Sequence, residues 1–339
     1  MNNKILLIYT GGTIGMVNDP VTNSLVPLNF KHITSQVPEI NNFDCQIDSY
    51  EFESPIDSSN VNIEFWKTLV SIIKQKYQQY DGFVILHGTD TMAHTASALS
   101  FMIQNINKPI ILTGSQLPIG TIRTDGKENL ITSIEVALAK HFNKPVVNEV
   151  CVCFENKLFR GNRVSKVNAE YFNAFSSENY PVLADIGIHI NYNESYFLKS
   201  SEKTPIFNDR LDPNVAVMKV FPGMTNQYVN AFFNIPNLKA LIIETYGAGN
   251  APTDEWFLEL LKQAEQKNIV LVNVTQCKGG SVNMGQYETS TYLKQIGMVS
   301  AHDMTIEATL TKLMFLMGNG ATGEILKKAI EKPISGEIY

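Results

Sequence analysis

Two threonines and an aspartate follow apolar runs of this sequence, at positions where hydroxyl chemistry could be placed. Thr13 lies in TGGTIG, directly after KILLIY, while Thr89 and Asp90 lie in HGTDTM, directly after GFVIL. A threonine hydroxyl acts as a nucleophile when a base takes its proton, and a carboxylate paired with a lysine could provide such a relay. Lys166, in RGNRVSK, is a candidate for that lysine. A solvated surface lysine is the alternative interpretation of Lys166.

The glycines of the first motif also allow two plainer interpretations. A phosphate-binding loop is disfavoured, because TGGTIG has neither the Gly-Lys-Ser/Thr ending of a P-loop nor the G-x-G-x-x-G spacing of a dinucleotide fold. A tight turn, with Gly11 and Gly12 supplying unusual backbone angles, is the simpler alternative. Asp90 could likewise serve only as the N-cap of the helix that follows it. The second motif favours a functional site over these alternatives, because the two segments together offer two hydroxyls and a carboxylate.

Short apolar runs alternate along the chain with stretches of helical spacing. Nearly continuous apolar strands between helices are typical of parallel sheets covered on both faces. We predict helices within residues 62–77 and 91–106, where apolar side chains recur every three or four positions. The strand runs are KILLIY, GFVILHG, PIILTGS, EVCVCF, VAVMKVFPG, KALIIETYGAGN and NIVLVNVTQC. The fold class is therefore α/β, with mainly parallel sheets flanked by helices.

A polar segment divides this pattern into two domains. Residues 191–214 contain Pro205 and Pro213 and show neither helical nor strand periodicity, so we interpret them as a linker. The prediction is a larger N-terminal catalytic α/β domain at 1–190 and a smaller C-terminal α/β domain at 215–339. In open parallel sheets ligands bind where loops leave the carboxyl ends of strands. Residues 10–15, 87–91 and 113–116 are therefore expected at one edge of the N-terminal sheet.

Composition excludes several classes of function. The formal net charge is −6 and no basic run is present, which disfavours binding to nucleic acid. No apolar stretch approaches the roughly 20 residues that cross a bilayer, and the five apolar residues near the N-terminus predict a core strand rather than a signal peptide. Scattered histidines and cysteines give no metal-binding spacing. We expect reduced thiols, a cytoplasmic location, and no metal or cofactor.

The motifs resemble those of a known family. YTGGTIGM, DGFVILHGTDTMAHTASALSFM, LTGSQLP and YGAGNAP are similar to segments of the bacterial L-asparaginases, specifically the cytoplasmic type. LFRGNR, VNVTQC and VNMGQY extend the resemblance in order, from near residue 4 to near residue 337. One TGGT motif alone carries little information, whereas TGGTIG and HGTDTM together are specific. Asn250, in YGAGNAP, matches a position that can line a site across a subunit boundary.

The resemblance implies roles for particular residues. Thr13 matches the nucleophilic threonine, and Thr89, Asp90 and Lys166 match the residues that act with it. Which threonine attacks first stays open in the sequence, and our hypothesis is Thr13. The implied substrate-binding residues are Asp57, Ser58, Ser59, Thr89, Asp90 and Ser115.

Two departures from the family pattern bear on mechanism and regulation. Leu25 stands where a tyrosine close to the nucleophile is expected. The resemblance also implies a second, allosteric asparagine site, and Glu244 stands where an arginine is expected to bind the effector carboxylate. Because a glutamate repels a carboxylate, we expect this site to be lost or altered. Its matching positions are Ser165, Glu244, Thr275 and Cys277.

The function that the resemblance implies is hydrolysis of L-asparagine to L-aspartate and ammonia by a homotetramer of two dimers. Three alternatives stay open at this point: an amidohydrolase with another preference, such as glutamine; a non-catalytic amino-acid sensor; and a nucleotide-binding protein. The sequence does not give the preference for asparagine over glutamine, because one methylene changes binding by only about 1–3 kcal/mol. It also does not give the turnover rate or the physiological role.

Overall fold

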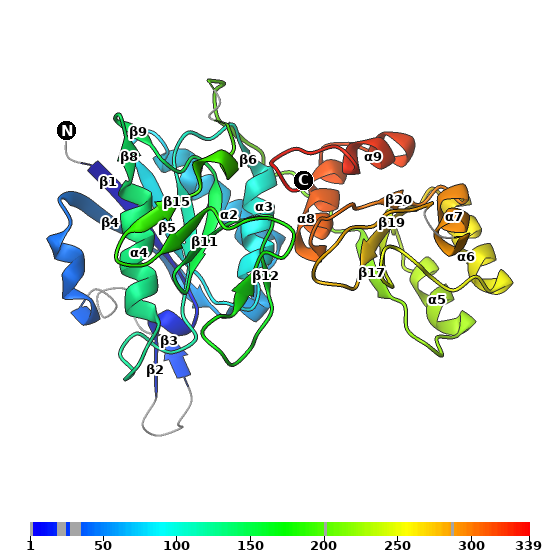
Figure 1. Cartoon of the computed structure of the whole chain (residues 1–339), viewed down its shortest axis with the longest axis horizontal. Coiled ribbons are helices and arrows are strands. Elements are labelled where there is room, and N and C mark those ends of the chain that lie inside the picture. The colour runs from blue at the N-terminus through cyan, green and yellow to red at the C-terminus, as the bar shows by residue number, and fades with distance from the viewer. Residues whose placement is uncertain (1–2, 19–24, 28–34, 200–201, 286–287) are drawn as a thin grey trace. The chain divides into compact units, whose positions relative to one another are not determined.

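The computed structural model describes residues 3–18, 25–27, 35–199, 202–285 and 288–339. They form two compact units (Figure 1). The first unit comprises residues 1–177 and 181–209, and the second comprises residues 178–180 and 210–339. The chain therefore enters the second unit briefly, at residues 178–180, before it completes the first.

The first unit is built on an eight-stranded sheet. Five neighbouring strands run parallel, and the last three continue the sheet antiparallel. In spatial order the strands are β4 (Cys45–Ile56), β1 (Asn3–Gly11), β5 (Gly82–Leu86), β7 (Ile110–Thr113), β10 (Val150–Phe154), β11 (Lys157–Arg160), β14 (Ala184–Ile186) and β15 (Ile190–Tyr192). Every residue of β5, β7 and β10 is buried, which is why these strands are apolar without alternation.

The order of the strands makes a topological switch point beside β1. The chain passes from β1 to β4 on one side, and then returns to begin β5 on the other side of β1. The segments that leave β1 and β5 therefore run in opposite directions from neighbouring strands. In open parallel sheets such a switch point is where ligands bind, at the carboxyl ends of the strands.

Helices pack on this sheet and are held by their apolar faces. They are α2 (Ile63–Lys76), α3 (Met92–Met102) and α4 (Gly126–Leu138). The side chains of Phe65, Leu69 and Ile73 are buried along α2, while nearly all of α3 is buried. The helices predicted within residues 62–77 and 91–106 are confirmed.

Short elements complete the first unit. The 3-10 turns are η1 (Thr13–Gly15), η2 (Pro38–Asn42), η3 (Ser58–Asn60) and η4 (Glu194–Tyr196). The two-stranded ladders join β2 (Met16–Asn18) to β3 (Leu25–Pro27), β6 (Ile103–Gln104) to β16 (Ile206–Phe207), β8 (Lys140–His141) to β9 (Lys144–Pro145), and β12 (Ser165–Lys166) to β13 (Phe175–Ser176).

Most of the segment that we interpreted as a linker packs within the first unit. Its strand β16 pairs with β6, and a buried ion pair anchors the residues before it. Arg160 Nε lies 2.7 Å from Glu149 Oε2, and the same guanidinium donates to the carbonyl of Tyr196. Glu149 also accepts a hydrogen bond from Leu198 N. Polar composition concealed this anchoring because the partners lie 36 and 49 residues earlier in the chain.

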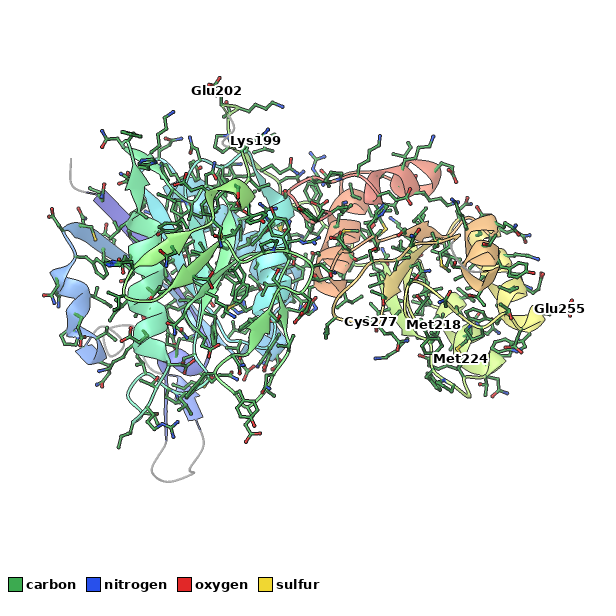
Figure 2. All side chains as sticks on the ribbon, in the orientation of Figure 1. Lys199, Glu202, Met218, Met224, Glu255 and Cys277 are labelled. Atoms are coloured by element: carbon green, nitrogen blue, oxygen red, sulfur yellow. The ribbon has the colours of Figure 1, made fainter. Side chains whose placement is uncertain are left out.

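The second unit has a smaller parallel sheet of β17 (Val215–Lys219), β18 (Ala240–Thr245), β19 (Val270–Thr275) and β20 (Val299–Ser300), in that order. Its core includes Met218 and Met224, labelled in Figure 2. Its helices are α5 (Asn226–Phe233), α6 (Glu255–Gln266), α7 (Glu288–Gln295), α8 (Ile306–Gly318) and α9 (Gly323–Ile330). The predicted fold class, two α/β units with mainly parallel sheets, is confirmed.

A fully buried ion pair fixes the end of the second unit. Lys312 Nζ, on α8, lies 2.6 Å from Glu337 Oε1, and neither side chain is exposed. The ammonium also donates to the carbonyls of Ile330 and Lys332. Burial lowers the pKa of Lys312, and the Glu337 carboxylate opposes that effect. Within the described residues, no helix is long and apolar enough to span a membrane.

Candidate active site

Four loops meet at the carboxyl ends of β1, β4, β5 and β7. Tyr9 pairs with Leu86, and Leu86 pairs with Thr113, so the segments after these strands start at the same edge. The hydroxyl of Thr10 donates to the carbonyl of Leu86 at 2.8 Å, which ties the first two corners together. Thr91 Oγ1 donates to the carbonyl of Ser58 at 2.7 Å, which ties the second corner to the loop after β4.

Glycines allow these loops to touch through their backbones. Gly12 has φ of 88°, and a Cβ at this position would collide with the backbone nitrogen of Gly88. A Cβ at Gly88 would in turn lie 2.5 Å from the Ser58 hydroxyl oxygen. A larger residue at either position would separate the corners. Gly12, Gly88 and Ser58 therefore form a continuous line of contacts across three loops.

Lys166 connects the two polar residues of the second corner. Its Nζ donates to Thr89 Oγ1 at 2.8 Å and to Asp90 Oδ1 at 2.7 Å. The Lys166 side chain is only 17% exposed, whereas that of Asp90 is 62% exposed. The ammonium is thus held between a hydroxyl and a carboxylate, and much of the carboxylate stays open to solvent or a ligand.

A short hairpin presents this lysine. In β12, Lys166 pairs with Phe175 of β13, and Val167 N donates to the carbonyl of Ala174. Phe175 packs edge-on against Phe154 of β10, with ring centroids 4.9 Å apart. Sequence separation had hidden this arrangement, because Lys166 lies 77 residues after Thr89.

Two of the plainer interpretations are wrong. Lys166 is not a solvated surface lysine, because it is mostly buried and ion-paired. Asp90 is not the N-cap of α3: the cap residue is Thr91, and no side chain caps this helix end. The Asp90 carboxylate instead pairs with Lys166. The structure therefore brings Thr89, Asp90 and Lys166 together.

Thr13 begins the turn η1 at the first corner and is half-buried. Tyr9 supports this turn from β1, since its hydroxyl donates to the carbonyl of Gly15 at 3.2 Å. Burial, with a smaller contribution from Glu51, raises the pKa of Tyr9 to about 12. The Thr13 hydroxyl has no hydrogen-bond partner among the residues that the structure describes. Leu25 is the first residue of β3 and pairs with Asn18.

The loop after β4 carries three of the predicted binding residues. Ser58 is buried against Gly88, while Asp57 and Ser59 are exposed. Asp57 Oδ1 accepts hydrogen bonds from the backbone nitrogen and hydroxyl of Ser59, both at 2.8 Å. These bonds hold the pKa of Asp57 below its usual value. Asp57 and Ser59 thus shape the turn that orients Ser58 toward the second corner.

The third corner carries Ser115 and a residue that the predicted site left out. The buried Ser115 hydroxyl donates to the carbonyl of Leu117, within its own loop. The next residue, Gln116, reaches Thr89: its Oε1 accepts from Thr89 Oγ1 at 3.2 Å. Its position directly after a predicted strand corner was the available signal. Glutamine has no charge and no nucleophilic atom, so the pattern gave it no role.

His87 is a packed structural residue of the second corner. Its Nδ1 lies 2.6 Å from the carbonyl oxygen of Gly88, and its Nε2 lies 2.9 Å from Thr95 Oγ1. Trp66 Nε1 donates to the same hydroxyl. Since a carbonyl only accepts, the network assigns the ring proton to Nδ1. Burial lowers the pKa of His87 to about 4, so the ring is neutral.

The residues expected at an altered effector site are distributed over both units. Ser165 is buried in β12 of the first unit. In the second unit, Glu244 is half-buried on β18, and Thr275 ends β19 with its hydroxyl donating to the carbonyl of Gly247. Cys277 N donates to Thr275 Oγ1, and its exposed side chain is labelled in Figure 2. Among the described residues, no cluster of three or more His, Cys, Asp or Glu could hold a metal.

The chain is similar to proteins of one family over its whole length. Residues 4–197 match the family model of the asparaginase N-terminal domain, and residues 214–330 match that of the glutaminase/asparaginase C-terminal domain. L-asparaginase 1 of Escherichia coli (strain K12) is 41% identical over 343 residues, covering 99% of this chain and 98% of the relative.

Two solved structures share the fold. L-asparaginase I from Vibrio cholerae O1 biovar eltor str. N16961 is 36% identical with a TM-score of 0.90, and the match covers 100% of both chains. The L-asparaginase of Thermococcus kodakarensis is 33% identical with a TM-score of 0.90, covering 99% of both chains. The fold and these matches define an amidohydrolase. The chain belongs to the asparaginase family, which confirms the resemblance of its motifs.

The buried neutral His87 predicts that the protein loses stability in mild acid. The folded pKa of about 4 lies below the ordinary 6.5, so the unfolded chain takes up the proton first as pH falls. The stability contributed by His87 is therefore complete above about pH 6.5 and declines toward pH 4, with a loss of about 2 kcal/mol between pH 7 and pH 5.

Urea unfolding at several pH values measures this effect. His87→Gln should unfold with a shallower pH dependence than the wild type between pH 7 and pH 5. The exposed His141 provides the control, because His141→Gln should leave the slope unchanged. Equal slopes for His87→Gln and the wild type would contradict a neutral, buried His87.

Proposed function

We propose that this protein hydrolyses L-asparagine to L-aspartate and ammonia at the corner formed by Thr13, Thr89, Asp90 and Lys166. The observation that carries the proposal is the position of Lys166 Nζ, within 2.8 Å of both Thr89 Oγ1 and Asp90 Oδ1. The backbone contact between Gly12 and Gly88 supports it, because it brings the corner of Thr13 to that of Thr89. Similarity to proteins named L-asparaginase supports the choice of substrate.

Covalent catalysis suits this set of residues. A side-chain amide is a poor electrophile, so hydrolysis is divided into acylation and deacylation. In the proposed first step, Thr13 Oγ attacks the amide carbonyl and ammonia leaves, which forms a β-aspartyl ester. Water, giving its proton to the relay of Thr89 and Lys166, then cleaves the ester. Backbone N–H groups of the glycine-rich corners would stabilise the oxyanion, a contribution commonly of about 3 kcal/mol per donor.

Binding would rely on the charges of a free amino acid. We assign Ser58 to the α-carboxylate and Asp90 to the α-ammonium. The exposure of the Asp90 carboxylate supports its role, because one face remains open while Lys166 holds the other. Ser115 would contribute near the amide, and Asp57 and Ser59 would keep Ser58 in place. A charge-assisted contact of this kind favours free α-amino acids over peptides.

We extend the proposal to the location and the oligomeric state of the protein, which we expect to be cytoplasmic and a homotetramer of two dimers. Membership of the asparaginase family supports both expectations. The mass measured by sedimentation equilibrium tests the tetramer. No cofactor or metal takes part in the proposed steps, because a threonine, a lysine and a carboxylate supply the nucleophile and the proton relay.

Ammonia release from L-asparagine, L-glutamine and D-asparagine tests the activity. For Thr13→Ala and Thr89→Val we expect at least about a 100-fold loss of kcat with L-asparagine, because each variant lacks a hydroxyl of the covalent cycle. Thr68→Ala is the matched control, since it removes an exposed hydroxyl on α2 and should keep full activity. Circular dichroism establishes that every variant is folded.

The assay also separates the alternatives. Release from glutamine at a higher kcat/KM would contradict the substrate assignment but keep the reaction class. If no amide releases ammonia while asparagine raises the melting temperature, the protein is a binder and the proposal is wrong. Unchanged activity in Thr13→Ala and Thr89→Val would place the chemistry elsewhere.

The altered effector site gives a separate prediction. Because the Glu244 carboxylate would repel the carboxylate of an effector, we expect initial rates to depend hyperbolically on asparagine concentration, with a Hill coefficient of about 1. Steady-state kinetics with the wild-type protein measures it. A sigmoidal curve with a Hill coefficient of about 2 would contradict the loss of regulation.

A further inference from the structure

The side-chain amide of Gln116 joins the third corner to the relay and to the hairpin that carries Lys166. Its Oε1 lies 3.2 Å from Thr89 Oγ1, and its Nε2 donates to the carbonyl of Tyr171 at 3.1 Å. Tyr171 lies in the loop between β12 and β13, so one amide contacts both the relay threonine and the loop after the relay lysine.

Hydrogen bonding settles the orientation of this amide. The carbonyl of Tyr171 can only accept, so it requires the NH₂ group of Gln116 on its side. A flipped amide would place two acceptor oxygens together at Tyr171. The Oε1 of Gln116 therefore faces Thr89, and Thr89 is the donor of that hydrogen bond.

This orientation determines where the Thr89 proton points. A charged lysine has three donors and no lone pair, so Thr89 Oγ1 accepts from Lys166 and cannot donate to it. The hydroxyl hydrogen then lies on the line to Gln116 Oε1. While Lys166 is an ammonium, the relay is ordered from Lys166 to Thr89 to Gln116. The charged group that contacts Lys166 is Asp90.

The backbone of Gln116 is fixed by an acidic residue on the same loop. Gln116 N donates to Asp125 Oδ2 at 2.9 Å, and Leu117 N donates to Asp125 Oδ1 at 3.1 Å. Asn129 Nδ2 bonds to the same carboxylate and to the carbonyl of Gly114. An acceptor held this way needs little reorganisation when the relay changes its protonation.

We propose that Gln116 is a positioning residue, which directs the Thr89 hydroxyl proton and so sets the protonation state in which the relay works. This inference rests on the proposed function of Thr89 and Lys166. While Lys166 is charged, Gln116 holds the Thr89 proton.

As the Thr13 O–C bond forms, the Thr13 hydroxyl proton passes to water, and the C–N bond breaks as a Lys166 proton moves to the departing nitrogen, which leaves as ammonia. The Thr89 hydroxyl then turns to the free lone pair of Lys166. A water O–H bond breaks as a new Thr89 O–H bond forms, the original Thr89 proton becomes a Lys166 N–H, and the hydroxide cleaves the ester. The Thr13 oxygen that leaves recovers its proton from water.

Two substitutions of Gln116 distinguish a role in directing the Thr89 proton from a role that only supports the loop. Gln116→Met keeps the length of the side chain but removes both hydrogen bonds. Gln116→Glu keeps the acceptor toward Thr89, adds a negative charge, and removes the donor toward Tyr171. Gln104 is the matched control, because its Nε2 also donates to a backbone carbonyl, that of Phe101, at 3.1 Å. Gln104→Met and Gln104→Glu should behave as the wild type.

The pH profile of kcat is the first readout. For Gln116→Met we expect kcat to fall about tenfold with KM within twofold, the effect of one lost hydrogen bond in the relay. For Gln116→Glu, the added carboxylate favours the ammonium form of Lys166, since both groups lie within hydrogen-bond distance of one oxygen. In the pH profile of kcat, the rise on the acidic side should therefore occur about one pH unit higher than in the wild type.

A second readout does not depend on activity. In protein labelled with ¹³C-lysine, the side-chain resonance of Lys166 is identified by its absence in Lys166→Met. Its titration should move to higher pH in Gln116→Glu and stay in place in Gln104→Glu. If the wild type releases no ammonia from asparagine, the proposed function fails, and this titration still tests the contact of Gln116 with the relay.

Three results would overturn the proposal. The first is that Gln116→Met and Gln116→Glu lower kcat equally and leave the acidic limb of the kcat pH profile in place, which is the behaviour of a residue that only supports the loop. The second is that the titration of Lys166 in Gln116→Glu occurs at the same pH as in the wild type. The third is that both variants turn over at the wild-type rate.

Discussion

The ammonium of Lys166, held between the Thr89 hydroxyl and the Asp90 carboxylate, is the interaction on which the account of this site depends. A mostly buried charge is tolerated only when hydrogen bonds and an opposite charge replace the lost water. Asp90 supplies the charge at 2.7 Å and Thr89 supplies an acceptor at 2.8 Å. Because a hairpin 77 residues later brings the lysine to them, the second corner and the β12–β13 ladder must both fold for these contacts to form.

The backbone of the first unit brings the corner that carries Thr13 to the corner that carries Thr89 and Asp90. The chain leaves β1 and β5 in opposite directions, which is the arrangement of a topological switch point. Gly12 and Gly88 let the two corners approach closely there, and Ser58 extends the contact to the loop after β4. His87 also supports the second corner, since its neutral ring donates to the carbonyl of Gly88. The close approach of the two corners thus depends on Gly12 and Gly88, which have no side chain. The buried, hydrogen-bonded side chain of His87 supports it.

Sequence reasoning predicted the parts of this arrangement that depend on local pattern. Apolar runs predicted the strands, helical spacing predicted α2 and α3, and strand ends predicted where polar residues gather. It named Lys166 as the lysine that acts with Thr89 and Asp90 but left a solvated lysine and an N-cap aspartate open as alternatives, because pairing across 76 residues leaves no trace in local spacing. It left out Gln116, because the contacts of its amide with Thr89 and Tyr171 are visible only in the structure. Segment 191–209 was interpreted as a linker because its anchors lie far away in the sequence: Glu149 directly precedes β10, and Arg160 ends β11.

The central claim is that Thr13 is the residue acylated during turnover, with Thr89 and Lys166 serving deacylation. The most direct measurement is peptide mapping by mass spectrometry after asparagine turnover is stopped in acid, in the wild type and in Lys166→Met, where the ester should be hydrolysed more slowly. The account predicts a β-aspartyl ester on the peptide that contains Thr13, and none when Thr13 is replaced by alanine. An ester on the peptide that contains Thr89 would contradict it, as would aspartate formation with no ester on either peptide.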